Sequence, residues 1–187
     1  RISEGIAPLK EGDVVDVVTK AGDFIARGHY QIGSIAVRVR TFEQEDIDSA
    51  WWERRIASAK SLRDALGIAH NESTTCYRLV HGEGDFLPGL IVDIYGNTAV
   101  VQAHSPGMHF ARTAIANALV ALDGVDIKNV YYKSETTLPY KAQLDPQNDY
   151  LIGGFETNVA IENGLKYPFI LIMLIKLQNN FSHFRFL

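Results

Sequence analysis

Two acidic side chains lie two residues apart in a glycine-rich turn. Glu83 and Asp85 follow Gly82 in the stretch RLVHGEGDFLPGLIVDIY, residues 78–95. Carboxylates at this spacing could carry general acid–base chemistry, one protonated and the other ionised. A solvated turn or a contact between domains is the stronger interpretation, because a hairpin of this kind is more often scaffold than active site.

A second set of candidates is basic and lies nearer the start of the chain. Arg38 and Arg40 alternate with apolar residues in segment 34–41. In a strand these two side chains point the same way and could meet successive phosphates of RNA. Lys20 and Arg27 are expected nearby, and the alternative to RNA binding is a solvated strand face.

Motifs for cofactor, metal and nucleophilic chemistry are missing from the sequence. There is no GxGxxG or GxxxxGK(S/T) loop, and Gly153-Gly154 is too short a fragment to count. His104 and His109 have no cysteine partner or carboxylate motif, so they predict no metal site. Cys76 has no recognisable base beside it and favours a structural thiol. We therefore assign no catalytic, cofactor-binding or metal-binding residue to this chain.

The composition indicates a soluble globular protein. The chain has 187 residues, of which 47% are hydrophobic, enough for one large domain or two small ones. A formal net charge of -4 gives no overall attraction to nucleic acid, so an RNA-binding surface would be a local patch. The single cysteine excludes an internal disulfide. With no secretory signal and no apolar run of membrane-helix length, we expect a cytoplasmic protein.

The basic candidates lie among short strands separated by glycine turns. Segments 14–18, 24–30 and 34–41 favour β structure, and turns fall at 11–13 and 20–23. This spacing predicts a small, mostly antiparallel β-barrel or sandwich.

An amphipathic helix is expected next. Asp48 or Ser49 could cap its start, and Gly67 suits the position just after its end. Trp51 and Trp52 lie at its beginning and are expected to anchor it in a core or domain interface rather than to stack on bases.

The acidic turn belongs to a second segment of strands, one helix and further strands. Residues 78–95 predict a bent β-hairpin, with Leu90, Val92 and Ile94 on one face. The later elements are expected as a strand at 97–103, a helix from Ser105-Pro106 to Asp123-Gly124, a strand at 129–133 and a loop at 138–148. Residues 151–155 and 157–167 are expected to form a closing hairpin or one long strand. This order predicts an α+β domain of the β-β-β-α-β-β type.

The hairpin sequence RLVHGEGDFLPGLIVDIYG resembles a motif of one enzyme family, R-L-(V/I)-(N/H)-G-E-x-D-x-L-P-G-L-(I/V)-V-D-x-Y. The family comprises the bacterial PUA-domain-containing, S-adenosylmethionine-dependent methyltransferases of cytosine C5 in large-subunit ribosomal RNA. Three more stretches are similar to it: the strands of 11–42, the helix of 47–66 and the strand of 156–169. The resemblance covers residues 8–169.

The resemblance implies a PUA domain that contacts RNA, a central α+β domain and a Rossmann-like catalytic domain. In the family, that last domain carries the cysteine nucleophile and the glycine-rich cofactor loop, and neither is found in this sequence. Ribosomal RNA is thus the implied partner. S-adenosylmethionine is the cofactor of the full-length family, and we expect none to bind this chain. The resemblance moves Glu83 and Asp85, with Arg78 and Asp93, to a structural or interdomain role.

We therefore expect four regions. They are an N-terminally incomplete PUA-like domain at 1–45, a linking helix at 46–70, a central domain at 71–169 and an atypical tail at 170–187. The tail has the sequence ILIMLIKLQNNFSHFRFL where the family continues with a cofactor segment. It suggests a truncated or frameshifted gene that has lost its catalytic domain, and its apolar run could support a homodimer. The alternatives are a stand-alone RNA-binding module and a non-enzymatic interaction protein that uses the apolar tail.

Overall fold

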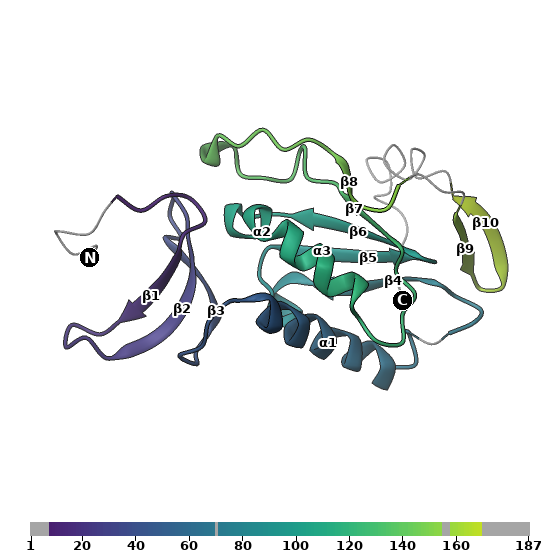
Figure 1. Ribbon diagram of the computed structural model, residues 1–187, viewed down its shortest axis with the longest axis horizontal. Helices are drawn as coiled ribbons and strands as arrows, with labels where there is room; N and C mark the ends of the chain where they lie inside the picture. Colours follow the sequence, from purple (N-terminus) through teal and green to yellow (C-terminus); the bar gives the residue numbers. More distant parts are fainter. Residues whose placement is uncertain (1–7, 70, 155–157, 170–187) are drawn as a thin grey trace.

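The computed structural model describes residues 8–69, 71–154 and 158–169, which form three sheets, a long connecting helix and two shorter helices. A three-stranded sheet near the N-terminus lies at one end of the molecule, and a five-stranded sheet forms the larger body beside it (Figure 1). The predicted tail, with its proposed role in a homodimer, lies outside the described residues.

The N-terminal sheet is antiparallel, with its strands in chain order. It consists of β1 (Val14–Val18), β2 (Phe24–Tyr30) and β3 (Val37–Thr41). The first two strands match the prediction, whereas β3 begins three residues later than expected because Ala36 is still part of the loop, its carbonyl accepting from Gln31 N–H at 3.0 Å. Among the described residues these strands form an open sheet, and closure into a barrel stays a prediction.

The linking helix α1 (Ser49–Ala65) has the predicted ends. Asp48 is its N-cap and accepts a hydrogen bond from Trp51 N–H at 2.8 Å, while Gly67 follows the helix with a φ of 68°. Trp51 and Trp52 are buried, with their rings edge to face at a centroid distance of 4.9 Å. The prediction that both tryptophans anchor the helix in a core is confirmed.

The five-stranded sheet has the order β4-β5-β6-β7-β8, with β6 and β7 parallel and the other pairs antiparallel. The strands and the helices between them follow in chain order as β4 (Cys76–His81), the 3-10 turn η1 (Gly82–Asp85), β5 (Leu90–Tyr95), β6 (Thr98–Ala103), α2 (Pro106–Phe110), α3 (Arg112–Val120), β7 (Asn129–Tyr132), the 3-10 turn η2 (Tyr140–Ala142) and β8 (Asp149–Ile152). The order along the chain is therefore β-β-β-α-α-β-β, which confirms an α+β arrangement and differs from the predicted β-β-β-α-β-β type by one helix.

The predicted single helix after Ser105 is wrong in one respect, since it is interrupted at Ala111. That residue ends α2 and precedes α3. The carbonyl of His109 accepts a hydrogen bond from the Arg112 side chain at 2.8 Å, which satisfies an acceptor near the interruption. Strand β8 also differs from the prediction, since it begins at Asp149 and ends at Ile152.

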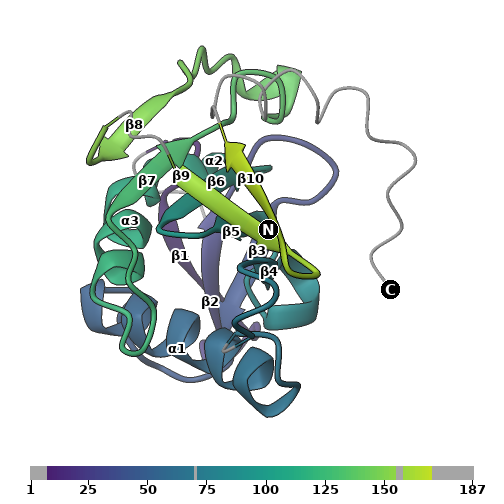
Figure 2. The same ribbon diagram turned by 90° about the vertical axis from the view of Figure 1, so that its right-hand side faces the viewer.

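The main core lies between the five-stranded sheet and the helices α1 and α3, which pack side by side (Figure 1). Leu90, Val92 and Ile94 are buried in this core, as predicted. The closing hairpin of β9 (Asn158–Glu162) and β10 (Leu165–Phe169) lies beside β4 and β5 (Figure 2). In the described part of the chain, no helix is long and apolar enough to cross a membrane.

Candidate functional site

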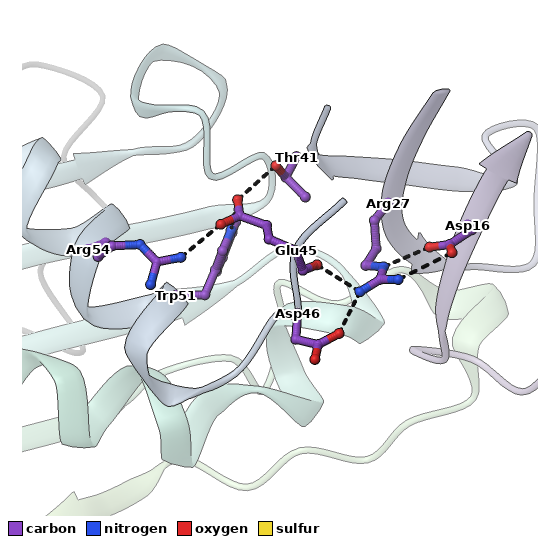
Figure 3. Close-up of polar contacts among 7 residues, drawn as sticks. All are labelled: Asp16, Arg27, Thr41, Glu45, Asp46, Trp51 and Arg54. Carbon is purple, nitrogen blue, oxygen red and sulfur yellow. Dashed lines mark hydrogen bonds and ion pairs between the residues drawn. The ribbon is translucent and has the colours of Figure 1, made fainter. Parts of the chain in front are cut away.

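Arg27, one of the four predicted RNA contacts, is engaged by acidic groups of the protein itself. Its guanidinium lies 2.7 Å from a carboxylate oxygen of Asp16 and 2.6 Å from one of Asp46, and donates to the Glu45 carbonyl at 2.7 Å (Figure 3). The hydrogen bond from Arg27 lowers the pKa of Asp16. Arg27 thus fastens β2 to β1 and to the segment before α1, whereas Lys20 lies exposed in the β1–β2 turn.

Glu45 is the centre of a second set of contacts in the same segment. Its carboxylate accepts hydrogen bonds from the Thr41 hydroxyl at 2.9 Å, the Trp51 indole at 2.9 Å and Arg54 at 2.8 Å (Figure 3). These donors, Thr41 first, hold the pKa of Glu45 below its usual range. The end of β3 and the first turn of α1 are therefore joined through one acidic side chain.

Arg40 is buried, with 3% of its surface exposed. Its Nε donates to His29 Nδ1 at 3.0 Å, its Nη1 to the Pro88 carbonyl at 2.5 Å and its Nη2 to the Ser105 hydroxyl at 3.5 Å. All three acceptors are neutral. Burial, together with the nearby Arg38, lowers the pKa of Arg40 to about 9. Arg40 therefore joins β3 to the loops that flank the five-stranded sheet rather than presenting its charge to solvent.

His29 packs behind Arg40 against α1 and α2. Its ring stacks on Trp52 at 6.5 Å between centroids, and Gly107 of α2 leaves room for it, since a Cβ there would collide with the imidazole. Burial, with a contribution from Arg40, lowers the pKa of His29 to about 3, which keeps the ring neutral and its Nδ1 able to accept. We call this set of contacts the domain junction; it comprises Arg27, His29, Arg40, Glu45 and their partners.

Arg38 lies at the edge of the junction and remains partly open to solvent, with 23% of its side chain exposed. Its Nε donates to Gln31 Oε1 at 2.9 Å, and its Nη1 lies 3.7 Å from Glu83 Oε1. That second distance is too long for a hydrogen bond. Arg38 was predicted to contact RNA and Glu83 to lie between domains, and the fold brings the two together.

Arg78 and Asp93 lie opposite each other in the β4–β5 ladder. The guanidinium binds both carboxylate oxygens, at 2.7 Å and 3.1 Å, and the hydrogen bond raises the pKa of Arg78. Both partners lie in the β4–β5 hairpin, so this contact stabilises the hairpin itself.

Asp85 is not displayed in the turn, since only 3% of its side chain is exposed. Its two oxygens form a bidentate ion pair with Arg63 of α1, and one of them accepts from His81 N–H at 2.5 Å. Arg63 also donates to the Arg78 carbonyl at 2.9 Å. Asp85 therefore ties the turn to the linking helix.

Sequence reasoning did not single out Arg63 or Glu45. A usable signal existed for Arg63, because it follows Trp52, Ile56 and Ala59 at helical spacing along the buried face of α1. A charged residue in that position requires a buried partner of opposite charge. Nothing in the local pattern identified that partner as Asp85.

The described residues offer little for bond-making chemistry. Burial, with Glu162 nearby, raises the pKa of the Cys76 thiol to about 11, so the reactive thiolate is scarce. His109 Nδ1 lies 2.7 Å from the Tyr132 hydroxyl. Among the described residues, no three His, Cys, Asp or Glu side chains are grouped to hold a metal ion. A hollow of about 300 Å³ beside Tyr77 and Asn97 is lined by none of the eight candidate residues.

Comparison with known proteins adds to this geometry. Residues 2–42 match a family of PUA-like domains. A Klebsiella pneumoniae protein named ribosomal RNA large subunit methyltransferase I is 42% identical over 123 residues, which are 63% of this chain and 30% of that protein. Proteins of the same name from Shigella boydii and Escherichia coli are 41% identical over 121 residues, 64% of this chain and 30% of theirs. The chain thus matches less than a third of the length of these relatives.

Solved structures show the same fold. A candidate S-adenosylmethionine-dependent methyltransferase from Streptococcus mutans aligns with a TM-score of 0.65 and 19% identity, covering 84% of this chain and 39% of the other. A structure of a candidate methyltransferase in complex with S-adenosylhomocysteine aligns equally well.

Proposed function

We propose that this chain is the RNA-recognition portion of a methyltransferase that acts on large-subunit ribosomal RNA and uses S-adenosylmethionine. The observation that carries the proposal is the combination of two matches in one chain. A PUA-like match over residues 2–42 is accompanied by 42% identity to enzymes named ribosomal RNA large subunit methyltransferase I. The finer assignment to cytosine C5 rests on the resemblance of residues 78–96.

Four regions are proposed on the same basis: a PUA-like domain at 1–45, a linking helix at 46–70, a central domain at 71–169 and a tail at 170–187. The domain junction supports a rigid arrangement of the first three. A buried arginine is costly to leave without hydrogen-bond acceptors, so the three acceptors around Arg40 favour one relative orientation. RNA phosphates bound to such a unit would set its register and orientation on the ribosomal RNA.

Among the described residues, the adjacent glycines do not fit a loop that would hold S-adenosylmethionine. The only adjacent glycine pair, Gly153-Gly154, follows β8, and a Cβ at Gly153 would collide with the Asn129 amide oxygen. Gly154 N–H donates to that same oxygen at 3.1 Å. The pair is therefore closed by a side chain instead of cradling a ligand.

Recognition without catalysis is the role these residues support. The high pKa of Cys76 makes it a poor nucleophile, and the acidic candidates Asp85 and Asp93 are occupied by arginines. What the chain contributes is binding and orientation. Methyl transfer in the proposed enzyme is assigned to groups other than these.

Binding to RNA over a range of salt concentrations tests the proposal. The 187-residue chain is titrated with in vitro transcribed large-subunit ribosomal RNA, and an unrelated transfer RNA serves as the control. We expect tighter binding to the ribosomal RNA, with an association constant that falls linearly with salt on a double logarithmic plot. Equal or undetectable binding to both RNAs would contradict the proposal and favour the interaction-protein alternative.

Two further measurements separate the remaining alternatives. Calorimetry with S-adenosylmethionine should give no binding heat, and a micromolar dissociation constant would place a cofactor site in this chain. Light scattering tests the proposed homodimer, which a clean monomer would exclude.

A further inference from the structure

One group of basic side chains remains open at the edge of the domain junction. It contains Arg38 from β3, Arg78 and His81 from β4, and His104 from the residue after β6. We call these four residues the seam cluster. They come from both domains, since β3 belongs to the N-terminal sheet and the other two strands to the central one.

The members of the cluster lie close to one another. Arg78 Nη1 is 3.4 Å from His81 Nδ1, and the main chain of His104 is fixed by a 2.8 Å hydrogen bond to the Gly89 carbonyl. Arg38 Nη1 lies 3.7 Å from Glu83 Oε1, two residues after His81, which places β3 beside this end of the hairpin. Partial burial, followed by Arg78 and Arg38, lowers the pKa of His104, and Glu83 opposes this shift. His81 and His104 are exposed, and Arg78 has 39% of its side chain exposed.

Positive charge exceeds negative charge at this position. Arg38, Arg78 and the buried Arg40 contribute three cations, against the two carboxylates of Glu83 and Asp93, which leaves an excess of one positive charge. The Arg40 side chain is held in place, because its N–H groups donate to neutral acceptors inside the junction. Its charge therefore adds to the potential felt by a ligand at the surface.

Glu83 is a weak competitor for this charge. Its side chain is 75% exposed and 3.7 Å from Arg38, and exposed pairs of this kind contribute little. Arg38 uses Nε for Gln31, and 23% of its side chain remains exposed. A phosphate can accept two parallel N–H bonds from a guanidinium and is a better partner than a distant carboxylate.

We propose that the seam cluster binds a backbone phosphate of RNA, with Arg38 as the principal contact and His104 and Arg78 beside it. This inference rests on the proposed function and adds to it a site that spans both domains. One phosphate bound there contacts the N-terminal sheet and the central domain at the same time. RNA binding then depends on the junction that holds the two together.

The test compares two variants that lose one positive charge each. Arg38→Gln removes the proposed contact, while Lys128→Gln removes an exposed lysine from the loop before β7, at the opposite end of the sheet. Both are titrated with in vitro transcribed large-subunit ribosomal RNA, after circular dichroism has shown that they are folded. We expect Arg38→Gln to weaken binding about fivefold to tenfold at 0.1 M salt and to reduce the salt slope by about 0.9, with Lys128→Gln unchanged.

An NMR titration gives a second readout that a structural role would not move. A phosphate in the cluster raises the pKa of His104 when a short single-stranded RNA is added, because the anion favours the imidazolium. If the wild-type chain binds ribosomal RNA but Arg38→Gln binds equally well with the same slope, the seam site is wrong and the proposed function stands. If the wild-type chain binds no RNA, both fail.

Discussion

The ion pair between Asp85 and Arg63 gives the sharpest prediction about stability. Both side chains are nearly inaccessible, at 3% and 10% exposed, and the pair joins η1 to α1. Removing one member of a buried pair leaves the other charged and without its partner, which costs about 3–5 kcal/mol. In Asp85→Ala, Arg63 would keep hydrogen bonds to the carbonyls of Arg78 and Ala59. We therefore expect a loss at the lower end, about 3 kcal/mol.

Urea unfolding followed by tryptophan fluorescence measures this loss. Trp51 and Trp52 are buried in the same helix as Arg63 and report its release from the core. With a slope of about 2 kcal/mol per molar urea, the midpoint should fall by about 1.5 M. Asp126→Ala is the matched control, since Asp126 is 79% exposed in a 3.4 Å pair with Lys128 and should cost less than about 0.5 kcal/mol.

A double replacement separates the loss of the pair from the cost of leaving one charge unpaired. Replacing Arg63 and Asp85 together by methionine and leucine removes both charges and should recover much of the stability lost by Asp85→Ala. A loss below about 1 kcal/mol in Asp85→Ala, or one equal to that of Asp126→Ala, would refute the reasoning, because the pair would then behave as a surface contact.

Three further predictions concern the junction and the thiol. The pKa of His29 is about 3 in the fold against an ordinary value of 6.5, so below pH 6.5 the unfolded chain takes up a proton that the folded protein excludes. The free energy of unfolding should therefore decrease as the pH is lowered below 6.5, by about 2 kcal/mol at pH 5. Thermal melting of His29→Asn should show a weaker dependence of stability on pH, and identical pH profiles for the two proteins would contradict this. Gly107→Ala should cost about 1–3 kcal/mol in urea unfolding, because the methyl group meets the His29 ring, whereas Gly154→Ala has open space and should be neutral. Cys76, with its pKa raised to about 11 from 9.0, should react with iodoacetamide about a hundredfold more slowly than a free cysteine peptide at neutral pH, and equal rates would show that the thiol is not desolvated.

Local patterns predicted most of the elements because their causes are local. Alternation after Gly89 predicted that Leu90, Val92 and Ile94 share a buried face, and Asp48 and Gly67 marked the ends of α1. The helix after Ser105 was predicted as one element, because the interruption at Ala111 carries no proline or glycine to signal it.

The charged residues show where local reasoning stops. Arg38 and Arg40 were treated as equivalent because they are two apart in one strand, yet one is at the surface and the other is buried. The difference arises because only Arg40 meets Pro88, 48 residues away in sequence. A strand pattern gives the direction of a side chain but not the element that covers it.

The sequence by itself determined the α+β class, the order of strands and helices, and the motif that resembles a family of ribosomal RNA methyltransferases. Periodicity and turn residues suffice for this, since each acts over a few positions. The tertiary structure alone decided which charges remain accessible. The Asp85 carboxylate is buried rather than exposed in the turn, because it pairs with Arg63 of α1, 22 residues earlier in the sequence. Arg38 and Glu83 became neighbours only when the two sheets met at the domain junction.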